Sequence, residues 1–265
     1  MKRSSSELKK LARATLSGKY STFIGTFVIY SLIVLAASII TSTFSTGFML
    51  SYTRMTIYIC VQLVLSFIWS VFGVGFTYQA MQSGRNKPIS VGNLFHGFTH
   101  HPDRFIVVTL LQTLIVLVLL APAIIFLVIS GFPIYAYNDI FIAISIPLFI
   151  IGYVFASILS LGFSLCYYLI IDNADMTAIE SLKESWKLMR GNKGRLFYIT
   201  LSFMGWGFLA GLSFGIGLLW ITPYLNVTSA YFYLDIIGEL GPVTPMAPVV
   251  TPMADSVVSP TLEQE

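Results

Sequence analysis

The stretch LFYITLSFMGWGFLAGLSFGIGLLWITPYLNVTSAYFYL, residues 196–234, contains 39 residues and no charge. As one α-helix it would be roughly 58 Å long at about 1.5 Å per residue, whereas the hydrocarbon core of a bilayer is about 30 Å thick. Two membrane-spanning helices fit this length if the chain turns near Gly215-Ile216-Gly217. We therefore predict spans at 196–214 and 218–237, with Pro223 kinking the second. One span followed by a stub at the membrane surface is the alternative.

Four further uncharged runs precede this stretch, and each is long enough for a helix of about 20 residues that crosses a bilayer. Their predicted spans are 23–44, 57–80, 105–129 and 141–171. The fourth is long for a single helix, and Pro147 and Gly152 predict a kink or tilt near its outer end. Hydrophobic residues make up 56% of the chain and charged residues only 10%, which excludes an ordinary soluble domain. The sequence predicts an all-α membrane protein, a six-transmembrane-helix bundle formed by residues 1–237.

Basic residues predict the orientation, because Lys and Arg are retained on the cytoplasmic side of a membrane. Six spans place 14 of the 15 Lys and Arg residues on one side, and only Arg54 on the other. Both ends of the chain are then expected in the cytoplasm. The polar lead of nearly 20 residues and the full-length span after it indicate that the N-terminus is not a cleavable signal peptide.

Three inner segments, at 7–16, 91–98 and 177–189, share one plan: an amphipathic stretch, a turn, and an aromatic residue that opens a span. In the third, Thr177 and Glu180 predict a capping box. Its apolar residues fall on one helical face, namely Ile179, Leu182, Trp186 and Met189. One interpretation is a threefold repeat of amphipathic helix plus hairpin. The other is that basic, amphipathic inner loops occur in any multi-span protein.

Helices of this kind lie among lipid headgroups, with basic side chains near anionic lipid. We therefore expect the lipid bilayer, and anionic headgroups at the cytoplasmic face, to be the principal partner. The candidate contact residues are Lys9, Lys10, Arg13, Lys183, Trp186, Lys187, Arg190, Lys193 and Arg195.

The segment DNADMTAIESLKESWKLMRGNKGRLF at 172–197, with GIGLLWITPY at 215–224, AYFY at 230–233 and NLFHGF at 93–98, resembles a known family. It is similar to the bacterial integral membrane family designated domain of unknown function 975, found mainly in Gram-positive bacteria. The similarity covers roughly residues 5–237. The resemblance implies a bacterial plasma membrane location and brings no established activity.

Residues that carry chemistry are sparse within the predicted spans. No charged residue and no histidine lies in the middle of any span, which disfavours proton-coupled transport but not an uncoupled carrier or a lipid-handling role. The strongest polar groups are Gln62, Gln112 and Asn226, for which hydrogen bonds between helices are the simpler interpretation. No motif of a catalytic nucleophile, a metalloprotease or a P-loop occurs, so we predict no enzyme, cofactor or nucleic-acid partner.

Two polar clusters outside the spans were considered as metal sites. His96 and His100 would share a helical face, but nothing nearby completes a ligand set, so a plain loop is favoured. Asp172, Asn173 and Asp175 are better explained as serving the start of the helix that follows them. We expect no metal site at either cluster.

Small residues recur every fourth position at Gly207, Gly211 and Gly215, and again at Gly152 and Ala156. This spacing lets helix backbones approach closely, either within the bundle, which we favour, or between two copies of the chain. Residues 238–265 contain five prolines and no Lys or Arg, which predicts a disordered tail.

Two functions are compatible with this sequence. The first is a non-catalytic, accessory, membrane-organising or protective protein, with a membrane-protein partner or as a homo-oligomer. The alternative is a permease or exporter of a small or amphiphilic molecule, since broken helices line many transport sites.

Overall fold

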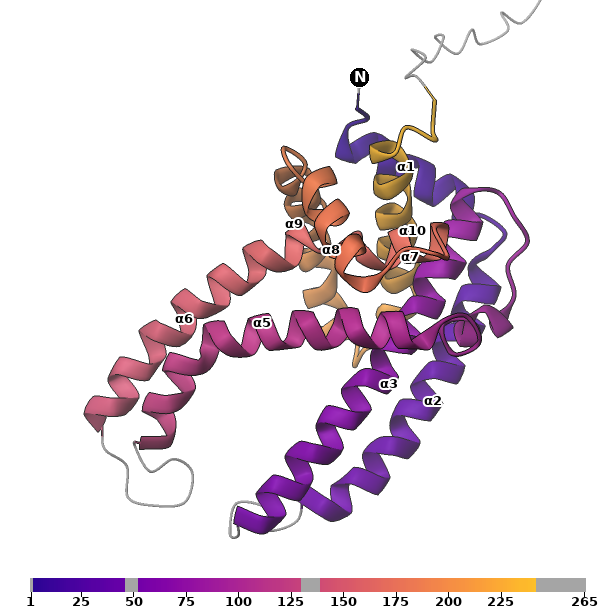
Figure 1. The fold of residues 1–265 in the computed structure, drawn as a ribbon. Coiled ribbons are helices and arrows are strands. Elements are labelled where there is room, and N and C mark those ends of the chain that lie inside the picture. The colour runs from indigo at the N-terminus through magenta and orange to yellow at the C-terminus, as the bar shows by residue number, and fades with distance from the viewer. Residues whose placement is uncertain (1, 46–51, 130–138, 242–265) are drawn as a thin grey trace, which may run out of the picture.

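The computed structural model describes residues 2–45, 52–129 and 139–241, and every regular element within them is helical (Figure 1). Five segments are long and apolar enough to cross a membrane: Tyr20–Ser42, Thr56–Gly84, Pro102–Ile129, Ile140–Asp172 and Lys193–Leu212. The prediction of an all-α membrane protein is confirmed.

Three helical hairpins organise the chain, each preceded by shorter helices. The first is α2 (Tyr20–Ser45) with α3 (Tyr52–Gly84), the second α5 (Pro102–Ile129) with α6 (Asp139–Gly162), and the third α9 (Lys193–Leu212) with α10 (Leu218–Ile236). The shorter elements are α1 (Ser5–Leu16), η2 (Val91–Phe95), α4 (His96–Thr99), α7 (Cys166–Asp172) and α8 (Ala178–Leu188). Figure 1 shows the first two hairpins extending in different directions from the end of the molecule that holds these shorter helices.

The last apolar run turns where the sequence predicts a turn. Helix α9 ends at Leu212 and α10 begins at Leu218, and the Ser213 hydroxyl accepts a hydrogen bond of 3.0 Å from the Gly217 N–H. A Cβ on Gly217 would lie 2.9 Å from the Ala210 Cα, so only glycine lets the two helices approach so closely here. Helix α10 has 19 residues and is not among the five segments above.

The fourth apolar run is interrupted at residues 163–165, near its inner end, and continues as a helix through Pro147 and Gly152. Helix α8 supports this interruption of the run. Its Ser185 hydroxyl donates to the Gly162 carbonyl at 2.8 Å and accepts from the Leu165 N–H at 3.2 Å, so it satisfies backbone groups that the break leaves free. The run therefore has a break, supported from another helix, that the sequence does not predict.

The buried core lies at the end of the molecule that carries the short helices, hereafter the basic end. Helix α1 buries Leu8, Ala12 and Leu16 in it, and α10 buries every residue from Ala230 to Leu234. The helices farther from this end mostly expose apolar side chains, as lipid-facing helices do. The amphipathic face of α1 therefore packs on protein.

Two glycines allow η2 and α4, the short helices between α3 and α5, to pack closely on α3. A Cβ on Gly75 of α3 would overlap the backbone carbonyl of Leu94 in η2, and one on Gly97 of α4 would lie 2.6 Å from the Val71 carbonyl oxygen. Backbone atoms cannot move aside as a flexible side chain can. These two positions therefore require glycine for η2 and α4 to lie against α3.

We expect Gly75→Ala to lower the free energy of unfolding by about 1–3 kcal/mol through overpacking. Gly73→Ala, two residues away on the same helix with open space around its Cβ, should leave stability unchanged or raise it slightly. Unfolding of the two variants in mixed detergent micelles, followed by circular dichroism, would compare them. Equal stabilities would contradict this packing.

Candidate functional site

Arg85 joins the inner ends of three helices at the basic end. Its guanidinium binds both carboxylate oxygens of Asp172, at 2.6 and 2.9 Å, and also binds Glu239 at 2.7 and 2.8 Å. The Tyr233 hydroxyl donates a further 2.7 Å hydrogen bond to Asp172. Hydrogen bonds with Asp172, and then with Glu239, raise the pKa of Arg85, so the cation persists at any physiological pH. The ends of α3, α7 and α10 are thus held together.

A second ion pair ties the N-terminus to the same place. Arg195 donates to Asp235 at 2.7 Å, and the Arg3 backbone N–H donates to the other Asp235 oxygen at 3.2 Å. The Arg3 guanidinium also reaches the Leu240 carbonyl at 3.0 Å. Residues near the N-terminus therefore lie beside the end of α10, and ordered contacts extend past the predicted boundary at residue 237. The predicted tail from residue 242 onward lies outside the described residues.

Helix α8 begins with the predicted capping box and buries its predicted apolar face only in part. The Thr177 hydroxyl accepts from the Glu180 N–H, and the return hydrogen bond from the Thr177 N–H lowers the pKa of the Glu180 carboxyl. The buried residues are Ala178, Ser181, Ser185 and Met189, whereas Ile179 is 56% exposed. Thr177, rather than the Asp172–Asp175 segment, provides the cap. Small side chains therefore pack α8 against protein together with Met189, whereas Leu182 and Trp186 of the predicted face are only partly buried.

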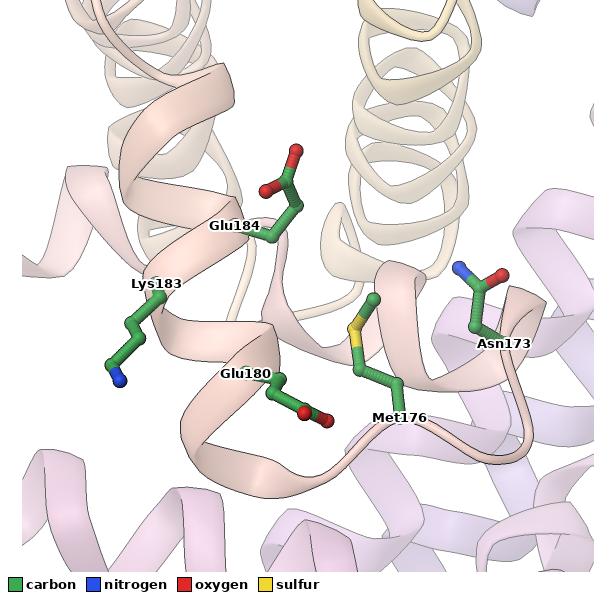
Figure 2. Close-up of a pocket in the computed structure, with 5 residues that line it drawn as sticks. All are labelled: Asn173, Met176, Glu180, Lys183 and Glu184. Carbon is green, nitrogen blue, oxygen red and sulfur yellow. The ribbon is translucent and has the colours of Figure 1, made fainter.

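A surface hollow of about 500 Å³ lies between the end of α7 and α8 (Figure 2). Glu184 and Met176 extend on one side of α8, and Lys183 points away on the other. Three polar side chains already have local partners, because Glu180 belongs to the capping box, Asn173 donates to Leu169 and Glu184 binds Lys187. Lys183 alone of the polar lining side chains has no hydrogen bond or ion pair among the described residues, and it points away from the others, so the hollow offers no convergent set of free polar groups.

The basic residues predicted to meet lipid divide into two groups. Arg195 is used internally, Lys193 lies 3.3 Å from the centre of the Trp186 ring, and Lys9 donates to Ser202. The second group is exposed and consists of Lys10, Arg13, Lys183, Lys187 and Arg190.

A cavity of about 370 Å³ lies among α3, α9, α10 and the α6–α7 break. It is lined by Asn226 and by the hydroxyl-bearing side chains of Thr77, Ser160, Ser164, Tyr167, Tyr168, Thr200 and Ser229. Gln112, the second predicted polar residue, lines a neighbouring cavity of about 280 Å³ that shares Ser160 with the first. Gln62, the third, is exposed and donates to the Tyr58 hydroxyl at 2.8 Å. Asn226 and Gln112 thus lie near one another, and Gln62 is separate.

The small residues predicted to pack helices together fall into two groups, of which one is in contact with a neighbouring helix and the other, among the described residues, is not. A Cβ on Gly152 would lie 2.7 Å from the Leu119 carbonyl oxygen, and Ala156 is buried, so this pair packs α6 on α5. Gly207 and Gly211 are exposed, and a Cβ on either would meet nothing within 4 Å among the described residues. Gly215 forms the α9–α10 turn with φ +85°. Packing within the bundle therefore accounts for Gly152 and Ala156 alone.

The histidines of the second connection stack instead of converging on a metal. The His96 ring lies between Tyr78, at 3.6 Å, and His100, at 4.1 Å between ring centres. Burial, followed by the charge of His100, lowers the pKa of His96 to about 4, so its imidazole is neutral at pH 7. In the part of the chain that the structure describes, no three His, Cys, Asp or Glu side chains are placed to hold a metal ion.

Sequence reasoning identified Asn226 and Gln112 but missed Arg85, Asp172 and Glu239 as a unit. A family model described as "Protein of unknown function (DUF975)" matches residues 1–239, which include all of these positions. No curated protein and no solved structure matches the chain.

We expect Arg85→Gln to lower the free energy of unfolding by about 2–3 kcal/mol, because it leaves two carboxylates without their cation. The full cost of breaking a buried pair is not expected, since both Arg85 and Asp172 side chains are 18% exposed. Lys87→Gln, at an exposed position in the same connection, should change stability by less than about 0.5 kcal/mol. Unfolding in mixed micelles would measure both.

The double variant Arg85→Gln/Asp172→Asn should recover part of the loss, because it removes both charges of the closest pair. Equal effects of Arg85→Gln and Lys87→Gln would show that Arg85 does not hold the three helix ends together.

Proposed function

The chain belongs to the family described as Protein of unknown function (DUF975), and we propose that it is a non-catalytic, membrane-organising accessory protein of the bacterial plasma membrane. The observation that carries this proposal is the division of its basic residues. Ion pairs occupy Arg85 and Arg195 inside the basic end, while five of the cations predicted to meet lipid are exposed there: Lys10, Arg13, Lys183, Lys187 and Arg190.

The exposed cations can bind anionic headgroups because they have few carboxylate partners within the protein. Among the described residues, Lys187 alone of the five has a carboxylate partner, Glu184 at 3.3 Å, and its side chain is 72% exposed. Such an exposed pair contributes little. A basic side chain near an anionic membrane surface gains about 1 kcal/mol. The proposed role is to gather anionic lipid around the basic end, and a protective function would follow from the same binding.

The proposed orientation places the basic end in the cytoplasm. Contacts of Arg3 with Asp235 and Leu240 support a topology with both described ends of the chain on one side, and therefore an even number of crossings. Five apolar segments alone would leave the ends on opposite sides, so we propose α10 as the sixth crossing. Reporters fused before Met1 and after Glu265 should both be cytoplasmic. An external signal from either one would contradict this topology.

We expect Lys183→Gln, Lys187→Gln and Arg190→Gln each to weaken the preference for anionic over zwitterionic phospholipid by about fivefold, because each removes roughly 1 kcal/mol of attraction. Native mass spectrometry of the full chain, released from nanodiscs of equal anionic and zwitterionic lipid, would measure the bound ratio. Raised salt should reduce the preference of the unaltered protein.

The matched control is Arg54→Gln, which removes one charge at the opposite end of α3 and should leave the ratio unchanged. If the three α8 variants bind both lipids as the unaltered protein does, these cations are not a lipid surface.

A permease or exporter is the second candidate, and the cavity beside Asn226 is the observation that favours it. Residues of the break at 163–165 line this cavity, and α10, which contributes Asn226, contains Pro223; interrupted helices border transport sites in other membrane proteins. No charged side chain lines the cavity, so such a protein would not couple transport to protons. Flux of a solute into proteoliposomes would distinguish a permease from an accessory protein, which moves none.

A further inference from the structure

The cavity beside Asn226 lies within the membrane-spanning part of the chain. Thr77 is seven residues from the inner end of α3, and Thr200 is seven residues from the inner end of α9. At about 1.5 Å per residue the cavity therefore lies roughly 10 Å from the basic end. Its volume of about 370 Å³ falls in the range of small-molecule sites. A molecule that enters it comes most directly from the surrounding lipid.

Four polar side chains that line the cavity have no hydrogen-bond partner among residues 2–45, 52–129 and 139–241. They are Ser160, Tyr168, Asn226 and Ser229. The other hydroxyls of the lining are occupied, since Thr77, Ser164 and Thr200 donate to backbone carbonyls and Tyr167 bonds to Thr109.

Tyr168 is buried, Asn226 and Ser229 are partly buried, and Ser160 is exposed. Where lipid replaces water, polar groups without a partner are unfavourable, so an occupant that bonds to these four would be stabilised. Asn226 supplies two donors and an acceptor, and each hydroxyl both donates and accepts. Hydroxyl groups of a ligand match this mixture, because they too donate and accept. The remaining lining is apolar, with Leu161, Leu165, Leu196, Leu225 and Phe232.

The lack of charged side chains in the lining indicates that the bound group is uncharged. Among the described residues no Lys, Arg, His, Asp or Glu lines the cavity, so a phosphate or an ammonium group would lie there without a counter-ion. An uncharged headgroup avoids that cost and can lie below the level of the phosphates. The neighbouring cavity, which shares Ser160, is lined by Ile115, Val116 and Leu159 and offers apolar surface beside the first.

We propose that the cavity lined by Ser160, Tyr168, Asn226 and Ser229 binds the uncharged, hydroxyl-bearing headgroup of a membrane glycerolipid. Two sources share this chemistry: diacylglycerol, with one free hydroxyl, and a glycosylated diacylglycerol, with several. This site goes beyond the proposed lipid surface, because it needs neither the exposed cations nor transport. The site would bind through polar groups of three helices, namely Ser160 of α6, Tyr168 of α7, and Asn226 and Ser229 of α10.

The full chain, extracted into polymer nanodiscs, tests the proposal. A glycoside detergent must be avoided because it carries the same headgroup chemistry. The discs are equilibrated with a mixture of diacylglycerol, glucosyl-diacylglycerol and phosphatidylglycerol, and the lipid retained on the protein is identified by native mass spectrometry. We expect one neutral glycerolipid to be retained at about one per chain, and its identity distinguishes the two sources.

Asn226→Leu should reduce retention of the neutral lipid by at least tenfold, and Ser160→Ala/Ser229→Ala by about threefold to tenfold. Gln62→Leu removes an equivalent amide from a span outside the cavity and should have no effect. The serine variant removes only two hydroxyls, so it decides the question even where Asn226→Leu unfolds.

Retention of phosphatidylglycerol alone, or of no glycerolipid, would overturn the proposal, as would equal retention by the cavity variants and Gln62→Leu. The separate proposal of an anionic-lipid surface is tested independently of this one. Loss of anionic selectivity in the α8 variants leaves retention of the neutral lipid intact, and the cavity variants keep their anionic selectivity.

Discussion

The bonding of one guanidinium, that of Arg85, to two carboxylates constrains the rest of this structure. Its partners Asp172 and Glu239 come from the ends of α7 and α10, so three separate segments must end at the same level. None of these charges can move into hydrocarbon without heavy cost, which holds the cluster at the membrane boundary. The pair between Arg195 and Asp235 adds the N-terminus to the same level through Arg3. Charge pairing thus sets the depth of the helices, and apolar length sets how far they extend.

The location of the core follows from this constraint. In lipid, no hydrophobic effect drives one apolar helix onto another, so the outer parts of the hairpins gain little by packing together. At the basic end, where the protein meets water, the hydrophobic effect favours burial of apolar side chains. The buried side chains of α1, α7, α8 and α10 gather there. The first two hairpins diverge away from that end (Figure 1). Their exposed apolar residues are what a lipid-facing surface requires, and the same faces remain available to a membrane partner.

Local signals in the sequence predicted much of the fold, and non-local ones did not. Uncharged runs located the hairpins, the length of residues 196–234 required a turn, and Thr177 with Glu180 marked the start of α8. The break after Gly162 depends on Ser185, which is 23 residues away. Arg85 finds its partners 87 and 154 residues along the chain, and no periodicity links those positions. The sequence predicts the buried face of α8 only in part: Met189 is buried as expected, but Ala178, Ser181 and Ser185, which look polar or neutral in sequence, are small enough to pack beside it.

Serine illustrates why the candidate site could not be read from residue type. Ser181 and Ser185 are fully buried, and their hydroxyls donate to the Ala178 and Gly162 carbonyls, so they hold α8 in place. Ser160 and Ser229 lie in the apolar helices α6 and α10, where they line a cavity and have no hydrogen-bond partner among the described residues. In a bilayer a hydroxyl that finds a backbone carbonyl is structural, whereas one left facing a cavity needs a partner from outside the chain. That distinction depends on the rotation of each helix about its axis, which tertiary packing determines. It is also why Asn226, which sequence alone interprets as a bundle contact, becomes the centre of a binding site.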